Sequence, residues 1–207
     1  MLQGEPARLQ AADHLGQLLA CLLIRRCLLL GHASHPRGSA RRTGWKTGTV
    51  NVRDATPDDI SELVRLREIL TDRMARDGTP VFEHWQEAYA ESLAERLGSP
   101  DTAVYVVDAP EGGLAACGVG LIFDRLPGPT LPDGRYGYVQ GMTTDPRHRR
   151  RGHGRAVMGA LMDWYRAQGV RKVDLHATSD GEPLYREFGF VEDGYPSLTW
   201  RDPSGRR

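Results

Sequence analysis

The chain has 207 residues, of which 40% are apolar and 26% charged, so it can bury one core and is neither disordered nor fibrous. Its formal net charge is zero, because residues 1–50 hold seven basic and two acidic residues and the remainder is mildly acidic. A general nucleic-acid-binding domain would be strongly basic, so the charge distribution argues against that class. All but two of the basic residues are arginine, which is typical of a GC-rich bacterial coding bias.

The three cysteines are odd in number and lack the C-x-x-C spacing of a zinc site; they are Cys21, Cys27 and Cys117. The sequence therefore predicts neither a disulfide framework nor a bound metal. A reducing cytoplasm is the expected compartment.

Residues 1–48 are expected to form a basic extension outside the fold. The apolar run at 15–30 is split by Arg25 and Arg26, so it falls short of the roughly 20 apolar residues of a membrane span. A secretory signal also carries its positive charge before the apolar run, whereas here the arginine pair lies within the run. Residues 31–48 are rich in Gly, Ser, Pro and Arg, which is typical of a linker. A single domain is expected over 49–207, with no contact to a membrane.

The remaining sequence alternates β-rich segments with segments of helical spacing. Thr56 and Pro57 provide a helix cap and a first-turn proline, and Gly169 and Gly189 each follow a helix. The predicted order is a strand at 50–53, helices at 56–70 and 82–97, strands at 102–107, 114–123 and 136–144, a helix at 154–168, a strand at 170–177, a short helix at 182–188 and a final strand pair at 190–192 and 198–200. This order predicts an α/β (α+β) mixed sheet of about six to seven strands with helices on both faces.

The strongest local charge feature lies between a predicted strand and a predicted helix. Positions 147–155 contain five arginines, two histidines, two glycines and no acid. The first N–H groups of the following helix point into this loop together with the positive end of its dipole, which favours an anion. Gly152 and Gly154 let the backbone approach a phosphate, and neighbouring arginines can pair with it. His148 is expected to face solvent or a phosphate. We interpret the loop as a pyrophosphate site.

Neither a Walker loop nor a dinucleotide-binding G-x-G-x-x-G is present. The loop instead reads Arg149-x-x-Gly152-x-Gly154, and PLYREFGF follows downstream with Tyr185, Gly189 and Phe190. With these motifs the chain resembles the GNAT superfamily of N-acetyltransferases, whose acetyl-CoA motif is a strand, [RQ]-x-x-G-x-[GA] and a helix. The resemblance covers residues 50–201.

The resemblance implies that acetyl-CoA binds as co-substrate along the strand and loop and that Tyr185 lies near its sulfur as the catalytic residue. Main-chain groups at Met142 and Thr144 are expected to pair with the pantetheine arm like an added strand. The residues expected to bind acetyl-CoA are Met142, Thr143, Thr144, Arg149, Arg150, Gly152, His153, Gly154 and Arg155.

The identity of the general base stays open in the sequence. Many family members place a glutamate on the fourth strand, but the comparable stretch offers Gln140, which cannot accept a proton. Water, Glu83, Asp124 or His176 could take the proton of the amine.

The predicted function is a cytoplasmic acetyl-CoA-dependent N-acetyltransferase that acts on a primary amine of a small molecule or peptide. Transfer is expected to be direct, in a ternary complex, without a metal. Two alternatives remain: a non-catalytic acyl-CoA-binding regulatory module, and nucleic-acid binding through the arginine loop. The chain is expected to be a monomer or homodimer.

Overall fold

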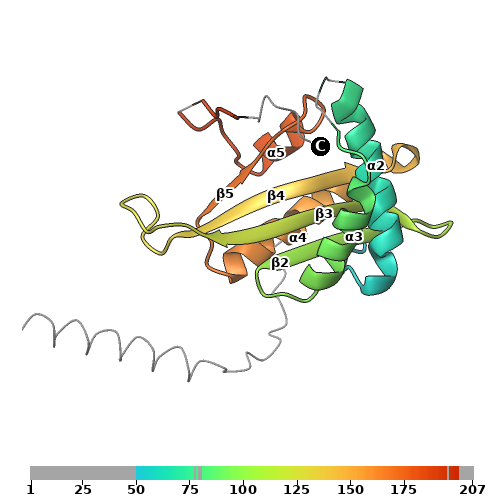
Figure 1. The fold of residues 1–207 in the computed structure, drawn as a ribbon, viewed down its shortest axis with the longest axis horizontal. Helices are drawn as coiled ribbons and strands as arrows, with labels where there is room; N and C mark the ends of the chain where they lie inside the picture. Colours follow the sequence, from blue (N-terminus) through green and yellow to red (C-terminus); the bar gives the residue numbers. More distant parts are fainter. Residues whose placement is uncertain (1–49, 77, 79–80, 195, 201–207) are drawn as a thin grey trace, which may run out of the picture. The chain divides into compact units, whose positions relative to one another are not determined.

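The computed structural model describes residues 50–76, 78, 81–194 and 196–200 (Figure 1). The extension expected at 1–48 lies outside these residues. The described part contains a five-stranded sheet with the strand order β1-β2-β3-β4-β5. Neighbouring strands pair antiparallel, except that β4 and β5 are parallel. The strands are β1 (Arg53–Asp54), β2 (Thr102–Asp108), β3 (Leu114–Asp124), β4 (Arg135–Thr144) and β5 (Lys172–Leu175).

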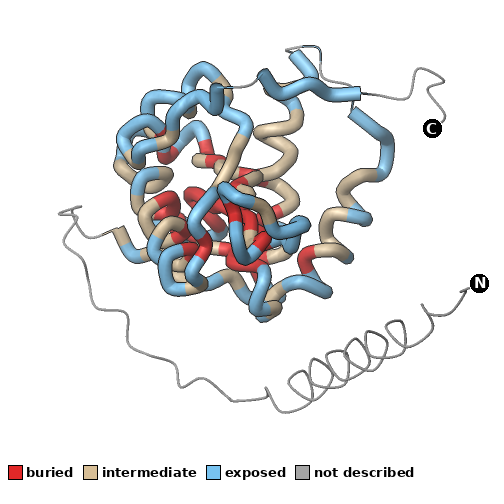
Figure 2. The backbone as a smooth tube through the Cα atoms, turned by 90° about the vertical axis from the view of Figure 1, so that its left-hand side faces the viewer, coloured by how far each residue is buried: buried red, intermediate tan, exposed pale blue. Residues whose placement is uncertain are grey.

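Helices cover both faces of the sheet, as the sequence predicts. One face carries α2 (Ile60–Arg76) and α3 (Trp85–Arg96), and the other carries α4 (His153–Ala167) (Figure 1). The short α5 (Glu182–Glu187) follows β5. Two 3-10 turns, Pro57–Asp59 and Pro146–His148, precede α2 and α4. Figure 2 shows the buried positions gathered between these layers, which form one apolar core on each side of the sheet.

Close contact between α4 and the sheet depends on glycines in the strands. A Cβ at Gly120 would lie 2.9 Å from Leu161 Cδ2, and one at Gly137 would lie 2.8 Å from Tyr165 Cε1. The fully buried Tyr165 hydroxyl accepts a hydrogen bond from the Leu121 amide at 3.1 Å and donates to the Tyr138 carbonyl at 2.8 Å. Side chains on the strands would push α4 away from the sheet and break these bonds.

The middle of β4 departs from regular pairing in two ways. Its register with β3 shifts between the pairs Cys117↔Thr143 and Val119↔Gln140, so one extra residue is accommodated on β4. Gly141 has φ 65° within this bulge, a left-handed conformation that favours glycine. On its other side, β4 pairs with β5 only as far as Val139↔Leu175. Beyond that pair the two strands have no further ladder contacts, and the separation begins beside the bulge.

The prediction of six to seven strands is wrong for the described residues, which form five. The segments at 190–192 and 198–200 contain no strand. Val191, Leu198 and Trp200 are 80%, 90% and 81% exposed, so they pack against nothing that would fix a ladder. Their β-forming side chains predict a strand locally, but Gly194 and Pro196 interrupt the segment and a strand needs a hydrogen-bonding neighbour.

Candidate active site

A cavity of about 580 Å³ lies at the end of β4, against the start of α4 and one side of α5. We call it the loop cavity. Ile69, Leu70 and Arg73 of α2 also line it, although the sequence did not predict them as site residues. All ten residues predicted as site residues line it: Met142, Thr143, Thr144, Arg149, Arg150, Gly152, His153, Gly154, Arg155 and Tyr185.

The backbone of the arginine loop turns so that α4 begins at the cavity. The Asp145 carboxylate accepts a hydrogen bond from the Arg147 amide at 3.0 Å and caps the 3-10 turn. Arg150 has φ 62° and Gly152 has φ 83°, both left-handed, and His153 then starts the helix. Because the first turn of α4 contains no acidic residue, its free N–H groups and dipole favour an anion in the cavity.

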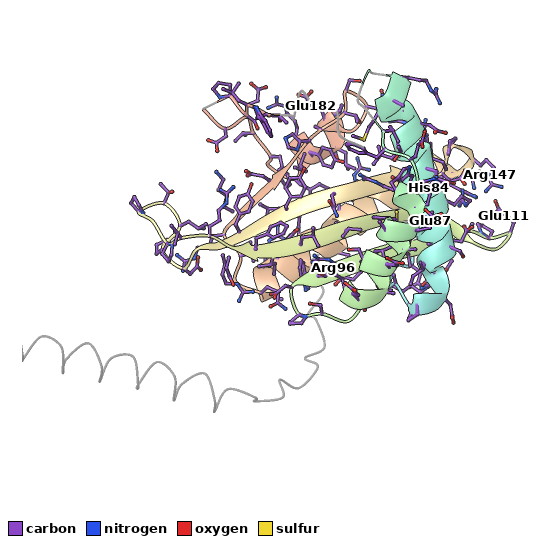
Figure 3. The ribbon with its side chains drawn as sticks, viewed as in Figure 1. His84, Glu87, Arg96, Glu111, Arg147 and Glu182 are labelled. Atoms are coloured by element: carbon purple, nitrogen blue, oxygen red, sulfur yellow. The ribbon has the colours of Figure 1, made fainter. Side chains whose placement is uncertain are left out.

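The arginines of the loop differ in their partners. Arg149 is exposed, and its Nε lies 3.5 Å from the Thr144 carbonyl. Arg155 forms a bidentate ion pair with Glu187 of α5, with a shortest distance of 2.7 Å. Arg147 points away toward Glu111 at the tip of the β2–β3 hairpin, 3.7 Å away (Figure 3). Arg149 therefore has more freedom to pair with a phosphate than Arg155, which also holds α4 against α5.

The two histidines of the loop have different environments. His148 is 3% exposed and its Nε2 lies 2.8 Å from Glu111 Oε1, so the expectation that it faces solvent is wrong. His153 lines the loop cavity, and its buried Nδ1 has no partner among the described residues. Burial, His148 and Arg151 lower the pKa of His153, so the ring is neutral at pH 7. Such an orphaned polar atom at a helix N-terminus suits a phosphate-bearing ligand.

Asp145 anchors the loop to the rest of the domain. Asp145 is 2% exposed, and its carboxylate accepts hydrogen bonds from Arg65 of α2 at 2.7 Å and from Arg147 at 3.0 Å. These guanidinium groups hold the pKa of Asp145 well below its usual range. Arg65 also donates a hydrogen bond to Glu62, and the Glu62 carboxylate accepts another from the Leu114 amide at 2.8 Å. The network fixes the loop relative to α2 and the hairpin.

A second cavity of about 1500 Å³ lies along β5. We call it the strand cavity. Its polar lining includes Tyr138 of β4, Asp174 of β5 and His176 just after β5, and Glu182 of α5 (labelled in Figure 3) also lines it. Tyr185 lines both cavities. Burial raises the pKa of Tyr185, so its hydroxyl keeps its proton at neutral pH.

Two side chains from the helices face the bulge of β4. A Cβ at Gly141 would lie 3.8 Å from the Tyr89 hydroxyl and 3.9 Å from Arg67 Nη1. The Arg67 guanidinium sits 5.8 Å from the centre of the Tyr89 ring. Burial raises the pKa of Tyr89 to about 12. Sequence reasoning missed this pair, because nothing in the spacing of α2 or α3 connects them to β4.

The structure separates the proposed proton acceptors. His176 lines the strand cavity, whereas Glu83 and Asp124 line neither cavity. Within the described part of the chain, no group of three His, Cys, Asp or Glu side chains could hold a metal. Cys117 is a buried free thiol, and Cys21 and Cys27 lie outside the described residues. Over the same described ranges, no helix has the length and apolar character needed to cross a membrane.

Comparisons with known proteins concern both the sequence and the fold of the chain. A sequence model described as the acetyltransferase (GNAT) family matches residues 63–190. The chain is 33% identical over 113 residues to glucosamine 6-phosphate N-acetyltransferase 1 of Oryza sativa subsp. japonica. That match covers 55% of this chain and 66% of the rice protein, which is just under two thirds of its length.

Two solved structures share the fold. A predicted acetyltransferase with acetyl-CoA from Clostridium acetobutylicum superimposes with a TM-score of 0.62 at 23% identity, covering 72% of this chain and 95% of that one. A GCN5-related N-acetyltransferase from Ralstonia eutropha JMP134 gives a TM-score of 0.61 at 26% identity, covering 72% and 97%. The chain therefore belongs to the acetyltransferase (GNAT) family, whose enzymes use acetyl-CoA.

Proposed function

We propose that the protein is an acetyl-CoA-dependent N-acetyltransferase that moves an acetyl group to a primary amine of a small molecule or peptide. Transfer is direct, within a ternary complex, and needs no covalent enzyme intermediate. The observation that carries this proposal is the meeting of two cavities at Tyr185. One cavity has the features of a phosphate site, and the other shares the same tyrosine in its lining.

The loop cavity suits the nucleotide end of acetyl-CoA. Left-handed Gly152, the first N–H groups of α4 and the unpartnered His153 Nδ1 together favour its pyrophosphate. The exposed Arg149 adds a charge that can pair bidentately. Met142 and Thr144 at the end of β4 offer main-chain groups to the pantetheine arm, where β5 no longer pairs with β4. The arm then directs the thioester toward Tyr185.

The reaction requires a neutral amine. An alkyl amine with a pKa near 10 is neutral in only about one molecule in a thousand at pH 7, a deficit of roughly 4 kcal/mol. The amine nitrogen attacks the acetyl carbonyl carbon and forms the C–N bond, and the C–S bond then breaks to release the thiolate of CoA. Tyr185 donates a hydrogen bond as negative charge develops on sulfur. Its raised pKa suits this role, because the hydroxyl remains a donor.

Glucosamine 6-phosphate is the first acceptor to test, because the rice relative is named for it. The residues that would select an acceptor come from α2 and the strand cavity, outside the cofactor motif. A panel should therefore add spermidine, lysine, an aminoglycoside and a lysine-containing peptide.

The test of the proposal is release of free CoA from acetyl-CoA in the presence of each amine, with product confirmed by mass spectrometry. Turnover with at least one amine is expected. Tight binding of acetyl-CoA in calorimetry without turnover on any amine would overturn the enzymatic proposal and favour a non-catalytic acyl-CoA-binding module. Binding of nucleic acid with a steep salt dependence, and none of acetyl-CoA, would overturn both.

A further inference from the structure

His176 occupies a defined position in the strand arrangement. Leu175 is the last residue of β5 paired with β4, opposite Val139, and His176 follows it directly. It therefore stands where the two strands separate. The bulge at Gly141 lies two residues beyond Val139 on the neighbouring strand. His176 lines the strand cavity together with Tyr185. Under the proposed function, this cavity is where the amine meets the thioester.

A tyrosine from the neighbouring strand holds the imidazole. The Tyr138 hydroxyl lies 2.6 Å from His176 Nδ1, and the rings meet edge to face at 5.9 Å. The backbone of Tyr138 is itself fixed, because its carbonyl accepts the hydrogen bond from the buried Tyr165. His176 is exposed, and no described residue hydrogen-bonds its Nε2. One ring nitrogen is thus oriented by the protein, while the other stays open to the cavity.

The other ionisable groups around this imidazole are less suited to accept a proton. Asp174 of β5 accepts a hydrogen bond from the Tyr136 hydroxyl. Glu182 of α5 pairs with Arg186 at 2.9 Å. Arg67 of α2 acts electrostatically on Tyr138 and is a cation. Tyr185 is assigned as a donor to sulfur, and Gln140 has no basic group.

We infer that His176 is the general base, accepting the proton of the attacking amine at Nε2, with the Tyr138 hydroxyl as the positioning group at Nδ1. This inference rests on the proposed N-acetyltransferase function. The ring begins as the tautomer with its proton on Nδ1, which donates to Tyr138 Oη and leaves the Nε2 lone pair free. As the amine lone pair forms the C–N bond, an amine N–H bond breaks and an N–H bond forms at Nε2. The imidazolium then releases this proton to solvent.

The environment of Tyr138 supports the assignment. Burial raises the pKa of Tyr138, so its hydroxyl stays neutral in the working range and adds no charge beside the base. A neutral hydroxyl accepts from Nδ1–H in both protonation states of the ring, so the orientation of the imidazole survives proton transfer. Solvent exposure of His176 provides the exit for the proton.

The test compares His176→Asn with His84→Asn as a matched control. Asparagine keeps a short polar side chain but cannot accept a proton, and His84 is exposed, lines neither cavity and has a φ of 58° that asparagine tolerates. The kcat and KM values are measured from pH 6 to pH 10 by CoA release, with whichever panel amine wild type acetylates fastest. His176→Asn is expected to lower kcat about 10²-fold at pH 7, since acid–base groups contribute about 10² to 10⁴. The deficit should shrink toward pH 10, where hydroxide in the solvent can accept the amine proton in place of the imidazole.

Further variants separate the roles. Tyr138→Phe should lower kcat about 3- to 10-fold and keep the shape of the wild-type pH profile, because it removes orientation but not the base. The KM for acetyl-CoA should not change in either variant, and His84→Asn should match wild type. His176→Gln is a second variant in case His176→Asn fails to fold, as judged by melting temperature.

Two results would overturn the assignment. A wild-type rate and pH profile in His176→Asn or His176→Gln would show that water, not His176, accepts the proton. A loss of equal size at every pH would show that His176 only shapes the cavity. Failure of the proposed function itself looks different, because wild type would then bind acetyl-CoA and release no CoA with any amine.

Discussion

The loop cavity and the strand cavity differ in where their polar lining comes from. Most of the polar lining of the loop cavity comes from the continuous stretch 142–155, and its attraction for anions depends on backbone direction at the start of α4. The strand cavity combines side chains from separate elements, such as Tyr138, His176 and Glu182. A ligand common to a whole family can be held by backbone, whereas an acceptor that varies must be held by side chains. The comparison predicts that substitutions in the two cavities affect different kinetic constants.

The largest expected effect is on the chemical step, from Tyr185→Phe. The substitution keeps the ring that packs 6.2 Å from Phe190 and removes only the hydroxyl. Single-turnover rates should fall about 10- to 1000-fold, allowing for partial replacement by water. Acetyl-CoA affinity and melting temperature should barely change. Equal single-turnover rates for the variant and wild type would make Tyr185 a packing residue shared by the two cavities.

Asp145→Asn should lower the stability of the domain, because it weakens the network that supports the loop cavity. The variant leaves Arg65 and Arg147 without a buried carboxylate, which we expect to cost about 2–3 kcal/mol in the free energy of unfolding. Because the pKa of Asp145 is lowered in the folded state, its contribution is present above the unfolded pKa of about 4. It is lost as the pH falls through the lower folded value.

Urea unfolding at pH 7 and pH 3 measures this contribution. The difference in the free energy of unfolding between wild type and Asp145→Asn should be smaller at the lower pH. Asp133→Asn is a suitable control, since Asp133 is exposed and its carboxylate accepts a hydrogen bond from the nearby Arg135 amide. A difference that does not become smaller would mean that the carboxylate charge is not what stabilises the loop.

Gly152→Val should affect binding rather than the chemical step. A Cβ at Gly152 meets nothing within 4 Å, so the penalty comes from φ 83°, which a β-branched residue adopts only with strain. The start of α4 should shift, and acetyl-CoA affinity in calorimetry should drop about tenfold or more, since charged hydrogen bonds are worth about 1.5–3 kcal/mol each. An affinity equal to that of wild type would remove this turn from the cofactor site.

Arg149→Ala should weaken acetyl-CoA binding by about tenfold at low salt. The affected group is exposed, so the effect should decrease as ionic strength rises. Arg166→Ala provides the comparison, because Arg166 is an exposed arginine of α4 paired with Asp163 and lies outside the loop cavity. Calorimetry at two salt concentrations should show a salt-dependent loss for Arg149→Ala and none for Arg166→Ala.

The smallest expected effect is from Gly159→Ala, in the same helix as the loop cavity. A Cβ there meets nothing within 4 Å and the backbone is helical, so alanine should stabilise the protein by about 0.4–1 kcal/mol. Acetyl-CoA affinity should stay at the wild-type value. A loss of affinity would show that α4 as a whole, not only its first turn, tunes the site.

Local sequence was sufficient to predict much of the fold. Helical spacing and caps predicted α4 and α5 to within one residue, and β-rich runs around a turn predicted the pairing of β2 with β3. The prediction of a final strand pair was wrong, because a strand needs a hydrogen-bonding neighbour and no local pattern shows whether that neighbour is present. The bulge at Gly141 was also missed, since its register shift appears only when β3 and β4 are paired.

The lining of the loop cavity was largely predictable from the sequence itself. Glycines and arginines between a strand and a helix impose their geometry through local backbone rules, and all ten predicted residues line one cavity. Tertiary structure decided what the sequence left open. It buried His148 against Glu111, paired Arg155 with Glu187, and brought Tyr138 to His176 across the separating strands. These contacts join residues 32 to 38 positions apart, and side chains at such distances meet only after the sheet and helices have packed.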